Sequence, residues 1–505
     1  MKQIKHLIYT AGIRNIHIAI QVIIAFVMMP IIIHSLGDRM YGLWVLVGAF
    51  MGYYGFLDLG LFSATSRFIS RALGRGDEIE MNEVFNNSLL LFTAIGLFVF
   101  LLSILISYLS GFFLKDPAEL HIFRFLLILL GINSAISFPI MAFRGILISY
   151  LRFDLIAYAN IIRLLIANLL IYFFLKEGYG IIALGVITFA TGLLENLLIV
   201  GFTRKVFSAM IVQLSIQKRQ KFRELFSYSW KTVAVQAGDL LRNKLDVFII
   251  AGYLSVNLVT YYALAARIIR IYSNIIISTL GIFRPIFSQY EGQNDFDSIK
   301  EKFLQIHNIS VPLSLFIGLS IIFYGKSFIL RWMGDDFTKS YIVLIILCSA
   351  FMTEFIQFPS NSLLYGISKH QYYAISNFIE GIFNLLLSLI LVRFYGLYGV
   401  AFGTAIPMIF IKLLVQPVYV CRTIDLPVLR YYWYTLFVPG VKTIFPLVIF
   451  FYFTRNFLEP NFIRIFQLGT LQTLLFLPYA FFIIFDNDLQ ILLKESFKKK
   501  RSKPS

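Results

Sequence analysis

Polar side chains recur at helical spacing within several long apolar segments of this chain. Positions i, i+3 and i+7 share one narrow face of an α-helix, because each residue turns the helix by about 100°. Such stripes comprise Thr188, Thr191 and Glu195; Gln236, Asp239, Asn243 and Asp246, bordered by Arg242; Arg267, Arg270 and Asn274; Glu354, Gln357 and Asn361; and Asn377, Glu380 and Asn384. A charge near a bilayer centre costs about 2.5–3.5 kcal/mol on insertion scales, so these faces should line a wet chamber or pair with one another.

Two cations on one helix face, Arg267 and Arg270, are the most informative of these residues. They repel each other unless an anion lies between them, and phosphate oxygens form strong charge-assisted hydrogen bonds with guanidinium groups. We therefore expect a cationic substrate site that suits a pyrophosphate and contains Arg267, Arg270, Arg242, Arg163 and Asn274. In the alternative interpretation, each arginine pairs with a carboxylate such as Asp239, Asp246 or Glu380, which would leave the chamber nearly neutral.

Several carboxylates in the apolar segments are candidates for binding a coupling ion, either a proton or Na⁺. These candidates are Asp58, Asp239, Asp246, Glu195, Glu354 and Glu380. Carboxylates inside membranes commonly form proton relays or ion sites, and structural pairing is the competing interpretation for each of them.

The motifs of several enzyme classes are absent from the sequence. A phosphate-binding loop that ends at Gly325-Lys326-Ser327 would need glycine where Ser320 stands. The chain has no H-E-x-x-H or G-x-S-x-G motif, and its six histidines lack metal-ligand spacing. Both cysteines, Cys348 and Cys421, fall inside apolar segments. We expect no metal, no cofactor, no disulfide and no direct hydrolysis of ATP.

The composition excludes a water-soluble fold. Of 505 residues, 59% are hydrophobic and 14% are charged, and the mean hydropathy is +0.79. A helix that spans about 30 Å of hydrocarbon needs roughly 20 mostly apolar residues. About fourteen such spans are predicted, near residues 14–36, 40–63, 84–109, 120–143, 154–175, 180–203, 229–252, 257–284, 301–324, 340–364, 371–394, 397–421, 432–453 and 462–485. The predicted fold class is an all-α integral membrane protein.

The distribution of lysine and arginine predicts the orientation of the chain. About 26 cations fall in the loops and ends assigned to one side and about 9 in those assigned to the other, and cytoplasmic loops carry the excess. Both termini should therefore face the cytoplasm, in a cytoplasmic (inner) membrane. Lys2, Lys5 and Arg14 precede an apolar run that is too long for a cleavable signal peptide, so the first span should be retained. The formal net charge of +17 then reflects orientation and contact with membrane lipid, and it indicates no nucleic-acid partner.

An internal repeat with an offset of about 220 residues divides the chain into two halves. Four matches carry it: Tyr41-Gly42-Leu43 with Tyr262-Ala263-Leu264, Gly76-Asp77 with Asn294-Asp295, Phe138-Pro139 with Phe358-Pro359, and Tyr179-Gly180 with Tyr398-Gly399. Because each copy has about six spans, the two copies should be parallel repeats with the substrate path between them. We predict an N-lobe over 1–203, a cytoplasmic or interfacial linker over 204–228, a C-lobe over 229–422, two further spans over 423–486 and a basic cytoplasmic tail over 487–505.

Several short motifs recur along nearly the whole chain in a characteristic order and spacing. They are Leu36-Gly37 with Tyr41-Gly42-Leu43-Trp44, Asp58-Leu59-Gly60-Leu61 with Ala64-Thr65 and Arg67, Phe138-Pro139 with Arg144-Gly145, Arg152-Phe153-Asp154-Leu155, and Phe358-Pro359 with Tyr365-Gly366. Together these motifs resemble Wzx-type polysaccharide flippases, which belong to the MOP superfamily with MATE drug exporters and MurJ-type lipid II flippases.

The resemblance implies a fold and a function. The fold would be a MATE/MurJ-like V of two six-helix lobes with two appended C-terminal helices, and a central cationic cavity would work by alternating access. The substrate would be an undecaprenyl-diphosphate-linked oligosaccharide, moved from the cytoplasmic to the outer leaflet with an ion gradient or the membrane potential. Expected partners are this lipid-linked glycan, membrane lipid, H⁺ or Na⁺, and a polysaccharide polymerase or export machinery.

Two other functions compete with this interpretation. A MATE-like ion-coupled exporter of small organic cations would share the fold, but a lumen with two arginines suits such cargo poorly. A membrane enzyme of glycan assembly would more often carry catalytic residues on a larger outer loop than the one predicted over about 325–340. Drug-accumulation assays and tests of glycan transfer by the purified protein would distinguish these classes from a flippase.

Overall fold

A computed structural model describes residues 2–58, 60–112, 114–213, 245–367, 369, 371–485 and 490. The described residues form helices and turns and contain no β-strand. Eleven of their helical segments are long and apolar enough to cross a membrane. The predicted all-α membrane fold is confirmed.

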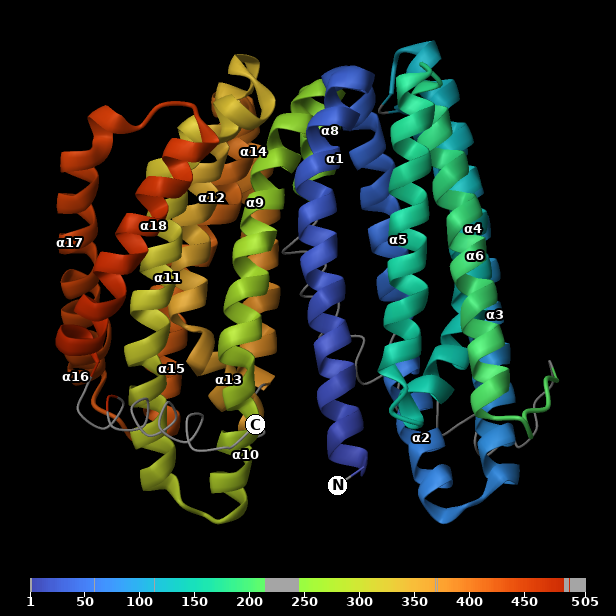
Figure 1. Cartoon of the computed structure of the whole chain (residues 1–505), viewed down its shortest axis with the longest axis horizontal. Helices are drawn as coiled ribbons and strands as arrows, with labels where there is room; N and C mark the ends of the chain where they lie inside the picture. The colour runs from blue at the N-terminus through green and yellow to red at the C-terminus, as the bar shows by residue number, and fades with distance from the viewer. Residues whose placement is uncertain are drawn as a thin grey trace. The chain divides into compact units, whose positions relative to one another are not determined.

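The described residues divide into two compact units. The first contains residues 2–213 together with Ile250–Thr260, and the second contains residues 245–249 and those from Tyr261 onward. The helices of the first unit are α1 (Lys2–Tyr54), α2 (Leu61–Arg75), α3 (Glu78–Leu109), α4 (Pro117–Ser149), α5 (Phe153–Lys176) and α6 (Gly180–Val206) (Figure 1).

The chain continues through the second unit, except that the end of α8 and the start of α9 belong to the first. Its helices are α8 (Asp246–Tyr253), α9 (Val256–Leu280), α10 (Arg284–Gly292), α11 (Phe296–Met333), α12 (Thr338–Ile356), α13 (Phe358–Gly366), α14 (Gln371–Phe410), α15 (Gln416–Thr423), α16 (Val428–Arg430), α17 (Val438–Thr454) and α18 (Phe462–Tyr479). In this unit α17 and α18 pack beside α11 (Figure 1).

The eleven segments account for thirteen of the fourteen predicted spans. The segment Ala19–Asp58 contains two predicted spans, because the helix kinks at Gly37, where φ is 76°. The segment Ile375–Thr423 also contains two, and it kinks at Gly396, where φ is 54°. Only glycine adopts such left-handed backbone at little cost, so a membrane helix can fold back there. The remaining predicted span, 229–252, falls mostly outside the described residues.

The two halves of the chain share turn conformations at corresponding places. Gly76 and Asn294 both adopt left-handed backbone, with φ of 70° and 55°. The aspartate that follows each one, Asp77 or Asp295, caps the next helix by accepting a hydrogen bond from a backbone N–H three residues on. These residues were matched in sequence, and the structure gives the two copies of the motif the same local fold.

The predicted span over 340–364 is not one continuous helix. α12 ends at Ile356, and α13 begins at Phe358 with Pro359 in its first turn. Proline lacks an N–H and restricts the residue before it, so it suits a helix start better than a helix interior. The predicted face of Glu354, Gln357 and Asn361 is interrupted at Gln357, the single residue between α12 and α13.

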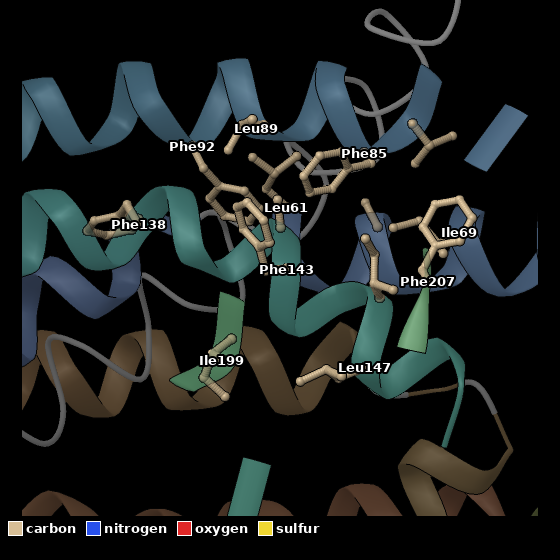
Figure 2. Packing of buried hydrophobic residues seen from close by; sticks show 14 of the residues in the cluster. Leu61, Ile69, Phe85, Leu89, Phe92, Phe138, Phe143, Leu147, Ile199 and Phe207 are labelled. Atoms are coloured by element: carbon tan, nitrogen blue, oxygen red, sulfur yellow. The ribbon is translucent and has the colours of Figure 1, made fainter. Parts of the chain in front are cut away.

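The core of the first unit is built from aromatic and branched side chains of α2, α3, α4 and α6. Phe85 and Phe143 meet edge to face, with ring centroids 5.0 Å apart, and Phe92 and Phe138 belong to the same cluster (Figure 2). Inside a membrane, helices associate mainly through close van der Waals packing, which small residues at the contacts permit. On α3, a Cβ added at Gly96 would lie 2.4 Å from the Ala135 carbonyl oxygen of α4.

Gly42 of α1 is a second close contact and gives a testable prediction. A Cβ added there would lie 2.0 Å from the Val256 carbonyl oxygen, within the same unit. Overpacking of this kind costs about 1–3 kcal/mol, so we expect Gly42→Ala to lower the thermal stability of the purified protein. The matched control is Gly48→Ala on the same helix, because a Cβ at Gly48 would meet nothing within 4 Å. Equal melting temperatures of the two variants would contradict this account of Gly42.

Candidate functional site

Two arginines of the first unit converge on one buried glutamate. Glu195 of α6 pairs with Arg144 of α4 and with Arg163 of α5, whose Nε lies 3.0 Å from the Glu195 Oε2. The Glu195 side chain is only 10% exposed, whereas those of Arg144 and Arg163 are 26% and 41% exposed. The cluster therefore carries a formal charge of +1, with both guanidinium groups accessible and their carboxylate partner buried.

The packing of α4 against α6 positions this glutamate. Gly192, one turn before Glu195, approaches α4 so closely that an added Cβ would lie 2.6 Å from the Asn133 side chain. The next residue along, Asn196, donates a hydrogen bond to the Ser137 hydroxyl at 3.0 Å. The stripe that contains Thr191 and Glu195 thus faces the inside of its unit, because both residues are buried.

The sequence interpretation did not include Arg144 among the site candidates, because this residue lies just beyond the predicted span over 120–143. α4 extends to Ser149, so Arg144 lies within the helix and reaches Glu195. Its spacing from Glu195 in sequence is 51 residues, and only the packing of two helices brings the pair together.

The predicted arginine pair of the second unit lies halfway along α9. Arg270 and Asn274 are exposed, and Arg267 is half-buried. Charged groups in the middle of a membrane span avoid lipid and face water or a bundle interior. The exposed side chains of Arg270 and Asn274 therefore lie on a polar face of α9, and Arg270 also has an interaction partner.

Two of the three carboxylates proposed as partners of these arginines are engaged elsewhere. The Asp246 Oδ2 accepts hydrogen bonds from the Tyr262 hydroxyl and from the Thr404 hydroxyl, the latter at 3.0 Å. Glu380 lies beside Lys412, with its Oε2 3.6 Å from the lysine Nζ. The third carboxylate, Asp239, lies outside the described residues, as does the candidate Arg242.

Asp246 lies among oxygen atoms of two other helices, α9 and α14. Thr404, which donates to its carboxylate, also accepts a hydrogen bond from the Asn384 amide at 3.3 Å, and Ser388 donates to the Asn384 carbonyl at 3.2 Å. Asp246 is only 6% exposed, and within the described part of the chain its Oδ1 has no hydrogen-bond partner. A buried carboxylate is costly unless it is paired, protonated or bound to a cation.

Glu380 and Lys412 form a fully buried ion pair that the sequence interpretation did not contain. Lys412 is 0% and Glu380 1% exposed, and the Lys412 Nζ also donates to the Asn377 carbonyl oxygen at 3.0 Å. The ammonium group lies 4.8 Å from the centre of the Tyr373 ring. Lys412 lies in a π-helical turn, Ile411–Val415, and such turns are frequent at functional positions.

A second buried polar network continues from this turn. Gln416 donates to the Asn361 carbonyl oxygen at 2.6 Å, and Gln357 accepts from the Tyr431 hydroxyl at 3.1 Å. The same hydroxyl lies 2.9 Å from the Nε2 of His307, which is fully buried. Polar stripes of the predicted spans thus pair with partners in α11, α15 and the segment before α17, which no helical spacing could reveal.

The two remaining carboxylate candidates have different surroundings. Asp58 is the last residue of the short helix before α2. Its carboxylate accepts a hydrogen bond at 2.8 Å from the backbone N–H of Phe62, in the first turn of α2. Glu354 is half-buried near the end of α12 and has an interaction partner. Both remain candidates for ion coupling.

The cluster of Arg144, Arg163 and Glu195 predicts an anion effect on stability. Glu195→Gln would leave two guanidinium groups facing each other, and a hydrogen bond to a charged group contributes about 1.5–3 kcal/mol. Because both arginines are partly exposed, we expect a smaller loss of stability, of about 1–3 kcal/mol. Inorganic pyrophosphate should raise the melting temperature of this variant more than that of the parent protein. An equal shift in both proteins would show that the two arginines do not form an anion site.

Comparison with known proteins identifies the family of this chain. A family model described as "Polysaccharide biosynthesis protein" matches residues 15–291, which is more than half of the chain. The chain belongs to this family. A "Putative O-antigen transporter" of Shigella flexneri is 24% identical over 421 residues, which cover 79% of this chain and 94% of the relative.

Two solved structures share the fold of this polysaccharide biosynthesis protein. One is titled "Lipid II flippase MurJ, inward closed conformation", with a TM-score of 0.70, 16% identity and coverage of 93% of this chain and 98% of the other. The second is a multidrug resistance MATE family transporter of the MOP superfamily in its inward-facing conformation, with a TM-score of 0.65, 15% identity and coverage of 81% and 94%. The predicted MATE/MurJ-like fold is confirmed, and the chain is a multi-pass membrane protein of the polysaccharide biosynthesis family.

Proposed function

We propose that this protein is a transporter, a flippase for an undecaprenyl-diphosphate-linked oligosaccharide. By alternating access it moves the glycan from the cytoplasmic to the outer leaflet of the cytoplasmic membrane, and both termini face the cytoplasm. In this proposal, the two lobes of six spans each, over 1–203 and 229–422, are the parts that move during alternating access. The neighbouring proteins named for O-antigen transport and lipid II flipping support this substrate class.

The main support for this proposal is the presence of accessible arginines halfway along membrane spans. Arg163 in α5 is 41% exposed, and Arg270 in α9 is also exposed. Such side chains are costly in lipid, and they are the residues best suited to bind phosphate oxygens in pairs. A cationic drug would meet repulsion at these positions, which disfavours the drug-exporter alternative. The lipid tail of the substrate would stay in the bilayer while the arginines bind its diphosphate.

Asp246 is the best-placed candidate for the coupling ion. Its carboxylate is buried beside two hydroxyl groups, and Asn384 lies one hydrogen bond further away. Oxygen ligands of this kind suit a small hard cation such as Na⁺, and a proton would neutralise the carboxylate equally well. We propose that the binding of one of these ions at Asp246 biases the transport cycle.

Translocation in liposomes tests the function directly. The purified full-length protein is reconstituted with lipid-linked oligosaccharide isolated from cells that express it, and a membrane-impermeant glycosidase reports the glycan on the outer surface. We expect the protected half of the glycan to become accessible in protein-containing liposomes only, and faster when an ion gradient is imposed. A protected fraction that matches protein-free liposomes would refute flipping. Movement of organic cations across the liposome membrane, in place of the glycan, would support the drug-exporter alternative.

A further inference from the structure

A polar cavity of about 540 Å³ lies within the first unit, away from the arginine cluster. Its walls are the start of the α1 segment after the Gly37 kink, the residues that lead into α4, and the turn between α8 and α9. The lining residues are Arg39, Leu114, Lys115, Asp116, Glu119 and residues 251–257. This volume lies within the range of about 300–1,000 Å³ that small-molecule sites occupy.

The charges of this cavity are paired within its own wall. Arg39 bonds to both carboxylates, to Asp116 at 2.7 Å and to the buried Glu119. Backbone N–H groups of Ala118 and Glu119 and the Arg39 guanidinium lower the pKa of Asp116, so its carboxylate is charged at neutral pH. With Lys115, the lining holds two cations and two anions, and its formal charge is zero. Neither a phosphate nor a metal cation is favoured by such a site.

The remaining lining groups suit an uncharged, hydroxyl-rich ligand. The ring of Tyr253 is 52% exposed and offers an apolar face for the C–H groups of a sugar. Asn257 and Ser255 supply an amide and a hydroxyl, and they are held together by a hydrogen bond from the Ser255 hydroxyl to the Asn257 carbonyl. Planar carboxylate, guanidinium and amide groups can each bind a pair of neighbouring hydroxyls.

The turn that carries these groups is held firmly to the rest of the unit. Thr260 donates from its hydroxyl to the Asp38 carbonyl oxygen at 2.5 Å, and the Val256 carbonyl lies against Gly42. A rigid wall lowers the entropy that a ligand must overcome on binding. The lysine and arginine distribution predicts that this end of the unit, with Arg39 and Lys115, faces the outside.

We propose that this cavity binds uncharged sugar residues of the lipid-linked oligosaccharide, as a recognition site separate from the arginines that bind the diphosphate. The inference rests on the proposed flippase function, and it assigns the glycan part of the substrate to residues that carry no net charge. Recognition of the sugar then depends on Tyr253, Asn257 and the pair of Arg39 with its carboxylates.

The test uses the full-length protein in nanodiscs of synthetic glycolipid-free phospholipid. One probe is the oligosaccharide released by mild acid from the lipid-linked repeat unit of the expressing cells, and the second is undecaprenyl diphosphate without sugar. Tyr253→Ala and Asn257→Ala should each weaken oligosaccharide binding, the first about tenfold, and leave undecaprenyl diphosphate binding unchanged. Tyr179→Ala is the control, because its ring is also exposed in this unit but lies outside the cavity.

The outcomes separate the sugar site from the flippase function. Equal oligosaccharide affinity in the parent and in both cavity variants overturns the sugar site, whether or not the protein flips its substrate. Absence of oligosaccharide binding by the parent protein, with undecaprenyl diphosphate still bound, overturns it as well. Failure of the parent protein to translocate lipid-linked oligosaccharide in liposomes refutes the flippase function itself.

Discussion

Replacing both Arg267 and Arg270 with alanine should abolish export of the polysaccharide repeat unit while leaving membrane abundance of the protein intact. Arg270 is exposed and Arg267 is half-buried on α9, so neither side chain belongs to the buried core. A hydrogen bond to a charged group contributes about 1.5–3 kcal/mol, and two of them correspond to a loss of roughly 10²–10⁴-fold in affinity for the diphosphate. The measurement is cell-surface polysaccharide in a strain whose only copy of the gene encodes the variant.

Two further variants show whether charge or position matters. Arg267→Lys/Arg270→Lys keeps both charges but loses the paired donors of guanidinium, so it should retain partial export. Arg464→Ala removes an exposed arginine at the start of α18 and should export normally. Normal export by the double alanine variant would refute the role of α9 in binding the diphosphate.

Breaking the buried pair of Glu380 and Lys412 should cause the largest loss of stability. Removing one partner of a fully buried ion pair costs about 3–5 kcal/mol, because the other charge stays buried without compensation. We therefore expect Glu380→Leu and Lys412→Met each to destabilise the protein strongly. The double variant should recover most of this loss, since apolar replacements of a buried pair are often neutral or stabilising.

Equilibrium unfolding in mixed detergent micelles measures this double-mutant cycle. A coupling free energy near zero would show that the two side chains do not interact in the folded protein. Export by the double variant is compared with its stability in order to separate structure from transport. A double variant that is stable but inactive in export would give the pair a role in the transport cycle. A matched control is Asn377→Ala, which removes a neutral acceptor of Lys412 and should cost less.

The membrane spans could be predicted from sequence because each needs a long apolar run, whatever its neighbours are. Turns marked by glycine were also predictable, and Gly37 and Gly396 end helices where the predicted spans end. The break at Gln357 was missed, since the surrounding residues are apolar enough to continue one span. Pro359 was visible in the sequence, but Pro139 lies inside an unbroken α4. A proline alone therefore does not show where a helix breaks.

The candidate site was only partly predictable, because partners come from helices far apart in sequence. The periodic stripes correctly indicated that Glu195 and Glu380 face the inside of their units. Their partners Arg144 and Lys412 belong to no stripe, and helical spacing carries no information about which helices pack together. Exposure of Arg270 likewise depends on the packing around α9, which the sequence pattern does not contain.

Accessibility of α9 to water tests the central claim most directly. Cys348 and Cys421 are replaced by alanine, a single cysteine is introduced as Asn274→Cys, and the full-length protein is treated in membranes with a charged thiol reagent. We predict rapid modification that undecaprenyl diphosphate slows, whereas Phe445→Cys, at an exposed apolar position halfway along α17, should stay unmodified. If Asn274→Cys proves as unreactive as Phe445→Cys, the polar face of α9 meets lipid, and the proposed diphosphate site is wrong.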